Sequence, residues 1–186
     1  MHRYDLDREF ILMADKILEN KEFQKMKTFL HHRDSVYEHS LDVAYYSYLL
    51  AKKLKKIKRN LSIENVVYAG LLHDFYLIPW RENRQYLPWK MHGFVHGRVA
   101  QKHAKEVFPE IYNKRIENSI RRHMFPLTII PPKYIEGWII TLCDKYASCD
   151  VLKKPKELPR YVGIDLSNGK LKKWYNVTKK FVNNMY

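Results

Sequence analysis

Apolar side chains recur along the chain mostly at spacings of three and four residues, which is the period of an amphipathic α-helix. The sequence has only six glycines, and no stretch alternates apolar and polar residues on both sides of a turn as a β-hairpin would. The pattern therefore predicts an all-α fold, a compact helical bundle that forms a single domain over residues 1–186.

Two helix starts are marked by capping residues. Ser35 and Glu38 have the spacing of a capping box, which places His39 in the first turn of a helix that continues through LDVAYYSYLLAKKL. Ser62 is a candidate cap for a helix over IENVVYAGLL, which delivers His73 at its carboxyl end. Four further helices are expected over about 7–20, from about 93 to Pro109, around 116–123, and from the Pro131–Pro132 pair to about 152.

The carboxyl-terminal region has a pattern of its own. After Lys153, proline and glycine residues interrupt the chain before a last amphipathic stretch, LKKWYNVTKKFV, at residues 171–182. We expect this extension and the first helix to pack on a core that spans about residues 30–152.

Composition limits the cellular setting. Apolar and aromatic residues make up 46% of the chain, enough to bury a full core without disulfides. The two cysteines, Cys143 and Cys149, lie six residues apart on one expected helix and point to different sides, so we expect no bond between them. No run approaches the roughly 18 apolar residues of a membrane span, and the charged N-terminus lacks a signal peptide. These features predict a cytoplasmic protein without a membrane partner.

The chain is strongly basic. It has 34 lysines and arginines against 20 acidic residues, a net charge of +14. Such a field attracts phosphates, whether they belong to nucleotides, nucleic acid or lipid head groups, and charge alone does not choose among them.

Imidazoles and carboxylates fall on segments that the apolar pattern would bury. A single histidine on such a face is usually a hydrogen-bonded core residue. Burying a polar group without a partner costs on the order of 1–3 kcal/mol, however, so several such groups together must share partners. A metal centre would satisfy all six of the residues concerned: His39, His73, Asp74, His96, His123 and Asp144.

At these positions the chain resembles a known family, the HD-domain superfamily of metal-dependent phosphohydrolases. The resemblance covers roughly residues 30–150. It rests on a series of short motifs, specific only in combination: Tyr37-x-His39-Ser40, Leu71-Leu72-His73-Asp74, His96-Gly97-x-x-Ala100, His123 and Asp144-Lys145.

The resemblance implies a helical bundle with a metal site between its core helices and hydrolysis of phosphate esters. Carried over by position, His39, His73, Asp74 and Asp144 would hold a first metal. His96 and His123 would hold a second, with Asp74 as the bridging ligand. Asp74, His73 and Lys145 are the candidate catalytic residues.

The donor set bears on the choice of metal. Nitrogen and oxygen ligands together suit iron or manganese, our first choice for two divalent ions, with zinc, cobalt, nickel or magnesium as alternatives. Two such ions would activate a water molecule and hold the phosphate oxygens during in-line attack.

Some positions leave alternatives open. Phe75-Tyr76 replaces the Ile-Gly that often follows the family's His-Asp pair, which puts the path of the next loop in doubt. His92, four residues before His96, is a ligand, a substrate contact or a neighbour of the site. Lys145 meets substrate phosphate or reaches solvent. Arg81 and Arg84, in the loop after the motif, are candidate phosphate contacts.

The favoured function is therefore that of an enzyme, a metal-dependent phosphohydrolase. Its substrate would be a phosphorylated small molecule of the nucleotide type, such as a dinucleoside polyphosphate or a nucleotide phosphodiester. The alternative is a non-enzymatic helical module that binds nucleic acid or a nucleotide through its basic surface.

Overall fold

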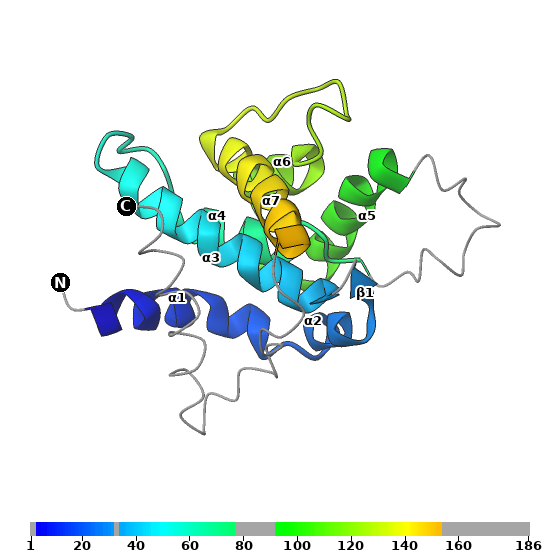
Figure 1. The fold of residues 1–186 in the computed structure, drawn as a ribbon, viewed down its shortest axis with the longest axis horizontal. Helices are drawn as coiled ribbons and strands as arrows, with labels where there is room; N and C mark the ends of the chain where they lie inside the picture. The colour runs from blue at the N-terminus through cyan, green and yellow to red at the C-terminus, as the bar shows by residue number, and fades with distance from the viewer. Residues whose placement is uncertain (1–2, 32–33, 77–91, 154–186) are drawn as a thin grey trace.

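The computed structural model describes residues 3–31, 34–76 and 92–153, and most of the described chain is helical (Figure 1). The described part confirms the all-α prediction, since its strands, β1 (Leu30–His31) and β2 (Asp34–Ser35), form only a two-residue antiparallel pair. In chain order the helices are α1 (Arg3–Leu18), α2 (Lys21–Gln24), the 3-10 helix η1 (Lys25–Thr28), α3 (Val36–Lys55), α4 (Ile63–Leu72), α5 (His92–Val107), α6 (Lys114–Arg122) and α7 (Ile135–Lys153).

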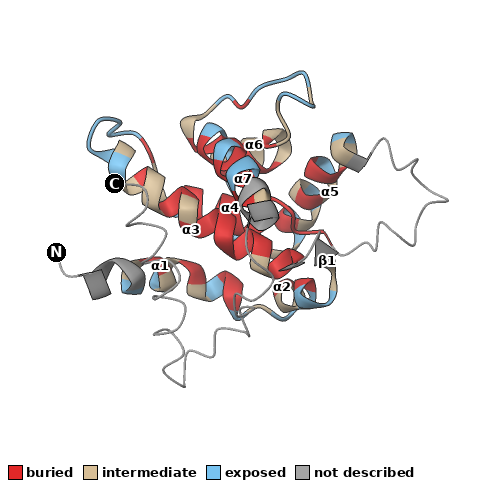
Figure 2. Cartoon of the chain, viewed as in Figure 1, coloured by how far each residue is buried: buried red, intermediate tan, exposed pale blue. Residues whose placement is uncertain are grey.

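Helices α3 and α4 form the centre of the fold, and most of their residues are buried (Figure 2). The predicted capping box of α3 is confirmed: Glu38 N donates to Ser35 Oγ, and Ser35 N donates to the Glu38 carboxylate. The predicted Ser62 cap of α4 is also present, with its hydroxyl accepting from Asn65 N. These caps fix where each helix begins and hence which way His39 and His73 point.

The two central helices approach each other closely at one glycine. A Cβ atom added to Gly70 would lie 2.6 Å from Ala44 Cα, a distance that real Cβ atoms do not adopt. Glycine at this position therefore lets α4 lie directly against α3. The close approach brings the carboxyl end of α4 beside the first turns of α3.

A short helical segment that the apolar pattern did not predict follows α1. The Asn20 side chain caps α2 by accepting from Glu22 N and Phe23 N. Phe23 and Met26 are fully buried, so α2 and η1 close one end of the core.

Helix α7 begins later than the sequence predicted. The proline pair Pro131–Pro132 lies before the helix, because the first helical hydrogen bonds, from Gly137 N and Trp138 N, run to Tyr134 O. Pro132 instead packs against the first turn of α7: a Cβ atom on Gly137 would lie 2.7 Å from Pro132 Cβ. The prolines thus form part of the approach to the helix and not its first turn.

A buried carboxylate ties three helices together at the start of α7. Glu136 is fully buried; it accepts from Arg115 Nη1 of α6 at 2.8 Å and from Ser62 N at the cap of α4 at 3.2 Å. This contact fixes the placement of α7 relative to α4 and α6. None of the helices in the described ranges combines the length and apolarity needed to cross a bilayer.

Candidate metal centre

The six predicted ligand residues come from five helices and meet in the interior. His39 lies in the first turn of α3, His73 is the C-cap of α4, and His123 is the C-cap of α6. His96 lies in α5 and Asp144 in α7. All six residues, Asp74 included, are buried, with at most 9% of any of them exposed.

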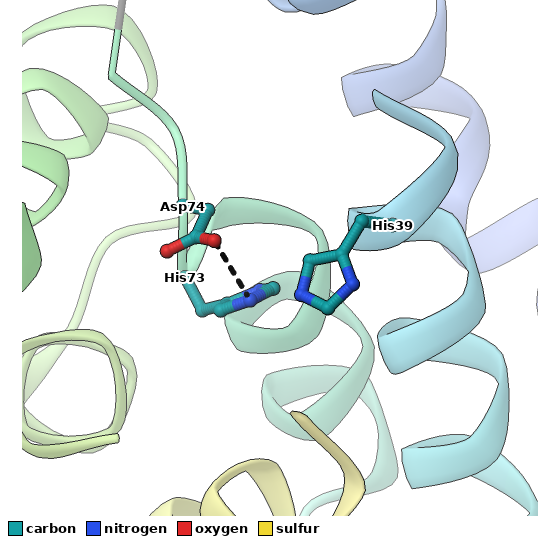
Figure 3. Close-up of side chains that lie close together, drawn as sticks. All are labelled: His39, His73 and Asp74. Carbon is teal, nitrogen blue, oxygen red and sulfur yellow. Dashed lines mark ion pairs between the residues drawn. The ribbon is translucent and has the colours of Figure 1, made fainter. Parts of the chain in front are cut away.

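One group of donor atoms forms between α3, the end of α4 and α7. His39, His73 and Asp74 each offer an atom within 4.8 Å of the others, and their side chains point into one space between the helices (Figure 3). His73 Nε2 lies 3.5 Å from Asp74 Oδ2 and 3.7 Å from Asp144 Oδ1. His39 Nε2 lies 3.1 Å from the same Asp144 oxygen. This group is called the first cluster below.

A second cluster uses the other oxygen of Asp74. Asp74, His96 and His123 again offer atoms within 4.8 Å of one another. Asp74 Oδ1 lies 3.3 Å from His96 Nε2 and 3.6 Å from His123 Nε2, and the two imidazole nitrogens lie 2.8 Å apart. Asp74 therefore belongs to both clusters, one carboxylate oxygen to each.

Backbone carbonyls orient two of the imidazoles. His73 Nδ1 lies 2.8 Å from Gly70 O, and His123 Nδ1 lies 2.7 Å from Ile120 O. Each carbonyl can only accept, so Nδ1 carries the proton and Nε2 is turned toward the cluster. Metal-bound histidines are commonly held in this way, with one ring nitrogen donating to a carbonyl and the other free to bind.

Burial and neighbouring charges shift the pKa values of His73, Asp144 and His123. Burial disfavours the charged form of His73, but the carboxylates of Asp74 and Asp144 and the Gly70 carbonyl raise its pKa to about 9. Burial likewise opposes ionisation of Asp144, yet His39 and His73 hold the pKa of that carboxyl well below its usual value. Burial, together with the neighbouring His96 and His73, lowers the pKa of His123 to about 3. Asp144 thus stays ionised in the interior, between the His73 imidazole, which favours its charged form, and the His123 imidazole, which stays neutral.

The donor set fits a divalent metal. His73 Nε2 is buried and makes no hydrogen bond, although it faces two carboxylates. A divalent cation in this space would displace the second proton of His73, accept the lone pair of Nε2 and offset the carboxylate charge. Mixed imidazole and carboxylate donors suit iron, manganese and zinc better than magnesium. Hence these residues could hold metal ions, one in each cluster.

Of the other predicted site residues, the structure describes the side chain of Lys145 only. The ammonium of Lys145 reaches back to the rim of the site, with Nζ 3.4 Å from the carbonyl oxygens of His123 and Thr141. His92 is the first residue of α5, but its side chain lies outside the described part. Arg81 and Arg84 also lie outside the described residues.

Two residues at the site were not predicted from the sequence to belong to it. Gly70 supplies both the close approach of α4 to α3 and the carbonyl that orients His73. Tyr76 is buried, with its ring 6.0 Å from that of His96, and burial and the Asp74 charge raise its pKa. The only sequence signal for Tyr76 was its place two residues after Asp74.

No curated protein matches the sequence. Among solved structures, the chain is similar to a conserved hypothetical protein from Pyrococcus furiosus, with 19% identity, coverage of 95% of this chain and 99% of that one, and a TM-score of 0.40.

A family model provides the assignment. The model described as HD domain matches residues 36–149, well over half of the chain and the span that contains both clusters. The chain therefore belongs to the HD-domain family, an all-α group of metal-dependent phosphohydrolases.

Proposed function

We propose that this protein is a phosphohydrolase that cleaves a phosphate ester or phosphoanhydride of a nucleotide-like substrate by means of a metal-activated water. The observation that carries the proposal is the sharing of Asp74 between two buried clusters, with one oxygen facing each. A structural metal site needs only one closed set of ligands, whereas two adjoining sets are typical of centres that act on phosphate.

The ligands divide between the two clusters. His39, His73 and Asp144 would hold one ion together with Asp74, and His96 and His123 would hold the other. Bound divalent ions supply Lewis acidity toward phosphate oxygens and lower the pKa of a coordinated water. Iron or manganese is the proposed metal.

The remaining residues act on the ligands and the substrate. The carbonyls of Gly70 and Ile120 keep the Nε2 atoms of His73 and His123 turned inward. The charge of Asp74 would be available to both ions, so we expect this carboxylate to be essential to the reaction. Lys145, at the rim, would pair with a phosphate oxygen of the substrate.

The overall charge supports a phosphorylated substrate. A net charge of +14 raises the local concentration of anions, and a nucleotide or dinucleoside polyphosphate carries several negative charges. We therefore favour a phosphorylated small molecule over a neutral ester.

Release of inorganic phosphate tests the proposal. The purified protein, loaded with Mn²⁺ or anaerobically with Fe²⁺, would be assayed on a generic aryl phosphate, on nucleotides and on dinucleoside polyphosphates. A coupled phosphatase would reveal products that retain their phosphate. We expect turnover by the wild type and none by Asp74→Asn.

A matched variant separates loss of chemistry from loss of folding. His103→Gln changes a histidine of α5 that contacts Phe75 and belongs to neither cluster, so this variant should keep its turnover. Turnover by Asp74→Asn at the wild-type rate would refute the enzyme assignment. Salt-dependent binding of DNA or RNA by a wild type without hydrolysis would instead favour the nucleic-acid-binding module.

A further inference from the structure

Helix α7 carries large apolar side chains on its outer face. Trp138, Leu142 and Tyr146 recur every four residues and are 40%, 58% and 46% exposed. Figure 2 shows exposed residues along the side of α7 that faces the viewer. We call Trp138, Leu142 and Tyr146 the α7 surface.

The opposite side of α7 is buried against the rest of the bundle. Ile139, Ile140 and Cys143 are buried against α3 and α4, and Asp144 lies in the metal centre. A helix that is apolar on both sides is typical of a helix covered on both sides. A contiguous exposed patch of large apolar residues indicates a contact site.

The sequence contains a segment of matching character. In the helical period, the stretch at residues 171–182 separates into two faces. The polar face holds four lysines and Asn176. The apolar face holds Leu171, Trp174, Tyr175, Thr178, Phe181 and Val182. An amphipathic helix of about three turns is marginal alone in water and needs a partner for its apolar face.

The chain geometry allows the two to meet. Helix α7 ends at Lys153, and 17 residues, 154–170, connect it to the amphipathic stretch. Such a connection spans up to about 55 Å when extended. The 19 residues of α7 measure about 28 Å, so the segment can reach any part of the α7 surface.

We propose that residues 171–182 form a helix whose apolar face packs on the α7 surface of the same chain. The juxtaposition leaves the lysines of the segment in solvent. Covalent connection gives the segment an effective concentration of order millimolar at this surface, well above that of a second protein in solution. The segment would then clamp α7, the helix that brings Asp144 into the metal centre.

A double-mutant cycle on the full chain tests the contact. Leu142→Glu changes the α7 surface, Phe181→Glu changes the apolar face of the segment, and the third protein carries both substitutions. The matched control is Asn176→Glu, which adds the same charge to the polar face of the segment. Because Leu142 is 58% exposed, glutamate at this position is compatible with the fold of residues 3–153. Leu142→Ser offers a milder second variant.

Unfolding by urea, followed by circular dichroism, gives the readout. We expect Leu142→Glu and Phe181→Glu each to lower the urea midpoint. The double variant should have a midpoint no lower than that of the less stable single variant, and Asn176→Glu should have the wild-type midpoint. This pattern follows because each substitution removes the same contact.

Other results would overturn the proposal. A wild-type midpoint for Phe181→Glu, or additive effects of the two substitutions, would show that the two surfaces do not meet. A midpoint that rises with protein concentration and loses this dependence in Leu142→Glu would identify a second copy as the cover. Phe181-dependent binding to vesicles of anionic lipid, together with an unchanged midpoint for Phe181→Glu, would assign the segment to a membrane surface.

Discussion

The Nε2 atoms of His96 and His123 lie 2.8 Å apart in the interior of the bundle. Since His123 donates its Nδ1 proton to the Ile120 carbonyl, its Nε2 atom presents a lone pair to His96. Asp74 Oδ1 lies within 3.6 Å of both nitrogens. Two imidazoles and a carboxylate converging on one point form a ready binding site for a cation, and this relationship leads to the first prediction.

Metal ions should stabilise the folded chain through this pair. After treatment with a chelator, added Mn²⁺ should raise the melting temperature, since an ion that binds only the folded state contributes about 2.7 kcal/mol at a hundred times its dissociation constant. His123→Ala should show a smaller increase measured by calorimetry, because it loses a ligand of the second cluster. His103→Ala should keep the wild-type increase even if its metal-free melting temperature differs. An equal increase in all three proteins would mean that the ions bind elsewhere.

The close approach at Gly70 predicts that alanine at this position destabilises the protein, although alanine usually stabilises a helix relative to glycine. Alanine in place of glycine inside a helix usually stabilises by up to about 1 kcal/mol. At position 70 the new methyl group would meet Ala44, so Gly70→Ala should destabilise by about 1–3 kcal/mol in urea unfolding. Because the nearest atom is the backbone Cα of Ala44, Ala44→Gly should not recover this loss. A stabilised Gly70→Ala variant would contradict the packing of α4 on α3.

The buried carboxylate of Glu136 should matter more than surface charges. Glu136→Gln keeps the shape of the side chain but loses a charge-assisted hydrogen bond with Arg115, worth about 1.5–3 kcal/mol. The control is Glu106→Gln, whose partner Lys102 is 3.9 Å away and whose side chain is exposed. That pair should contribute less than about 1 kcal/mol. Denaturant unfolding of both variants measures the difference, and equal losses would argue against the role of Glu136 in holding α7.

The capping box predicts a small loss of stability when Ser35 is replaced by a residue without a hydroxyl group. Ser35→Ala removes the hydroxyl that accepts from Glu38 N and should cost about 1 kcal/mol of unfolding free energy. Ser35→Thr retains the hydroxyl and should recover most of this loss. Because His39 lies in the first turn of α3, the alanine variant should also bind metal more weakly, as isothermal titration with Mn²⁺ would show. Unchanged stability in Ser35→Ala would mean that other contacts fix the start of α3.

Much of the bundle could be predicted from the sequence because its helix starts are chemically marked. Ser35 with Glu38 and Ser62 with its apolar run each identify a helix start within a residue. The start of α7 was misplaced, since proline is equally compatible with a first helical turn and with the segment before it. Only the packing of Pro132 on Gly137 decides between the two.

The meeting of the ligands depends on tertiary contacts that periodicity does not encode. The family resemblance predicted that the histidines and aspartates share a site with Asp74 as the bridging ligand, but not which Asp74 oxygen faces which cluster. That division follows from the turn after α4, which starts at His73, three residues beyond the contact of Gly70 with Ala44. The position of Tyr76 beside His96 depends on the same turn, and its place two residues after Asp74 does not reveal that contact.

The central claim is that Asp74 joins two metal sites, and the metal content per chain tests it most directly. Proteins reconstituted with Mn²⁺ and freed of excess ion would be measured by inductively coupled plasma mass spectrometry. The two clusters predict two ions for the wild type, one each for His39→Ala and His123→Ala, and a loss at both sites for Asp74→Ala. Wild-type metal content in Asp74→Ala would contradict the shared centre.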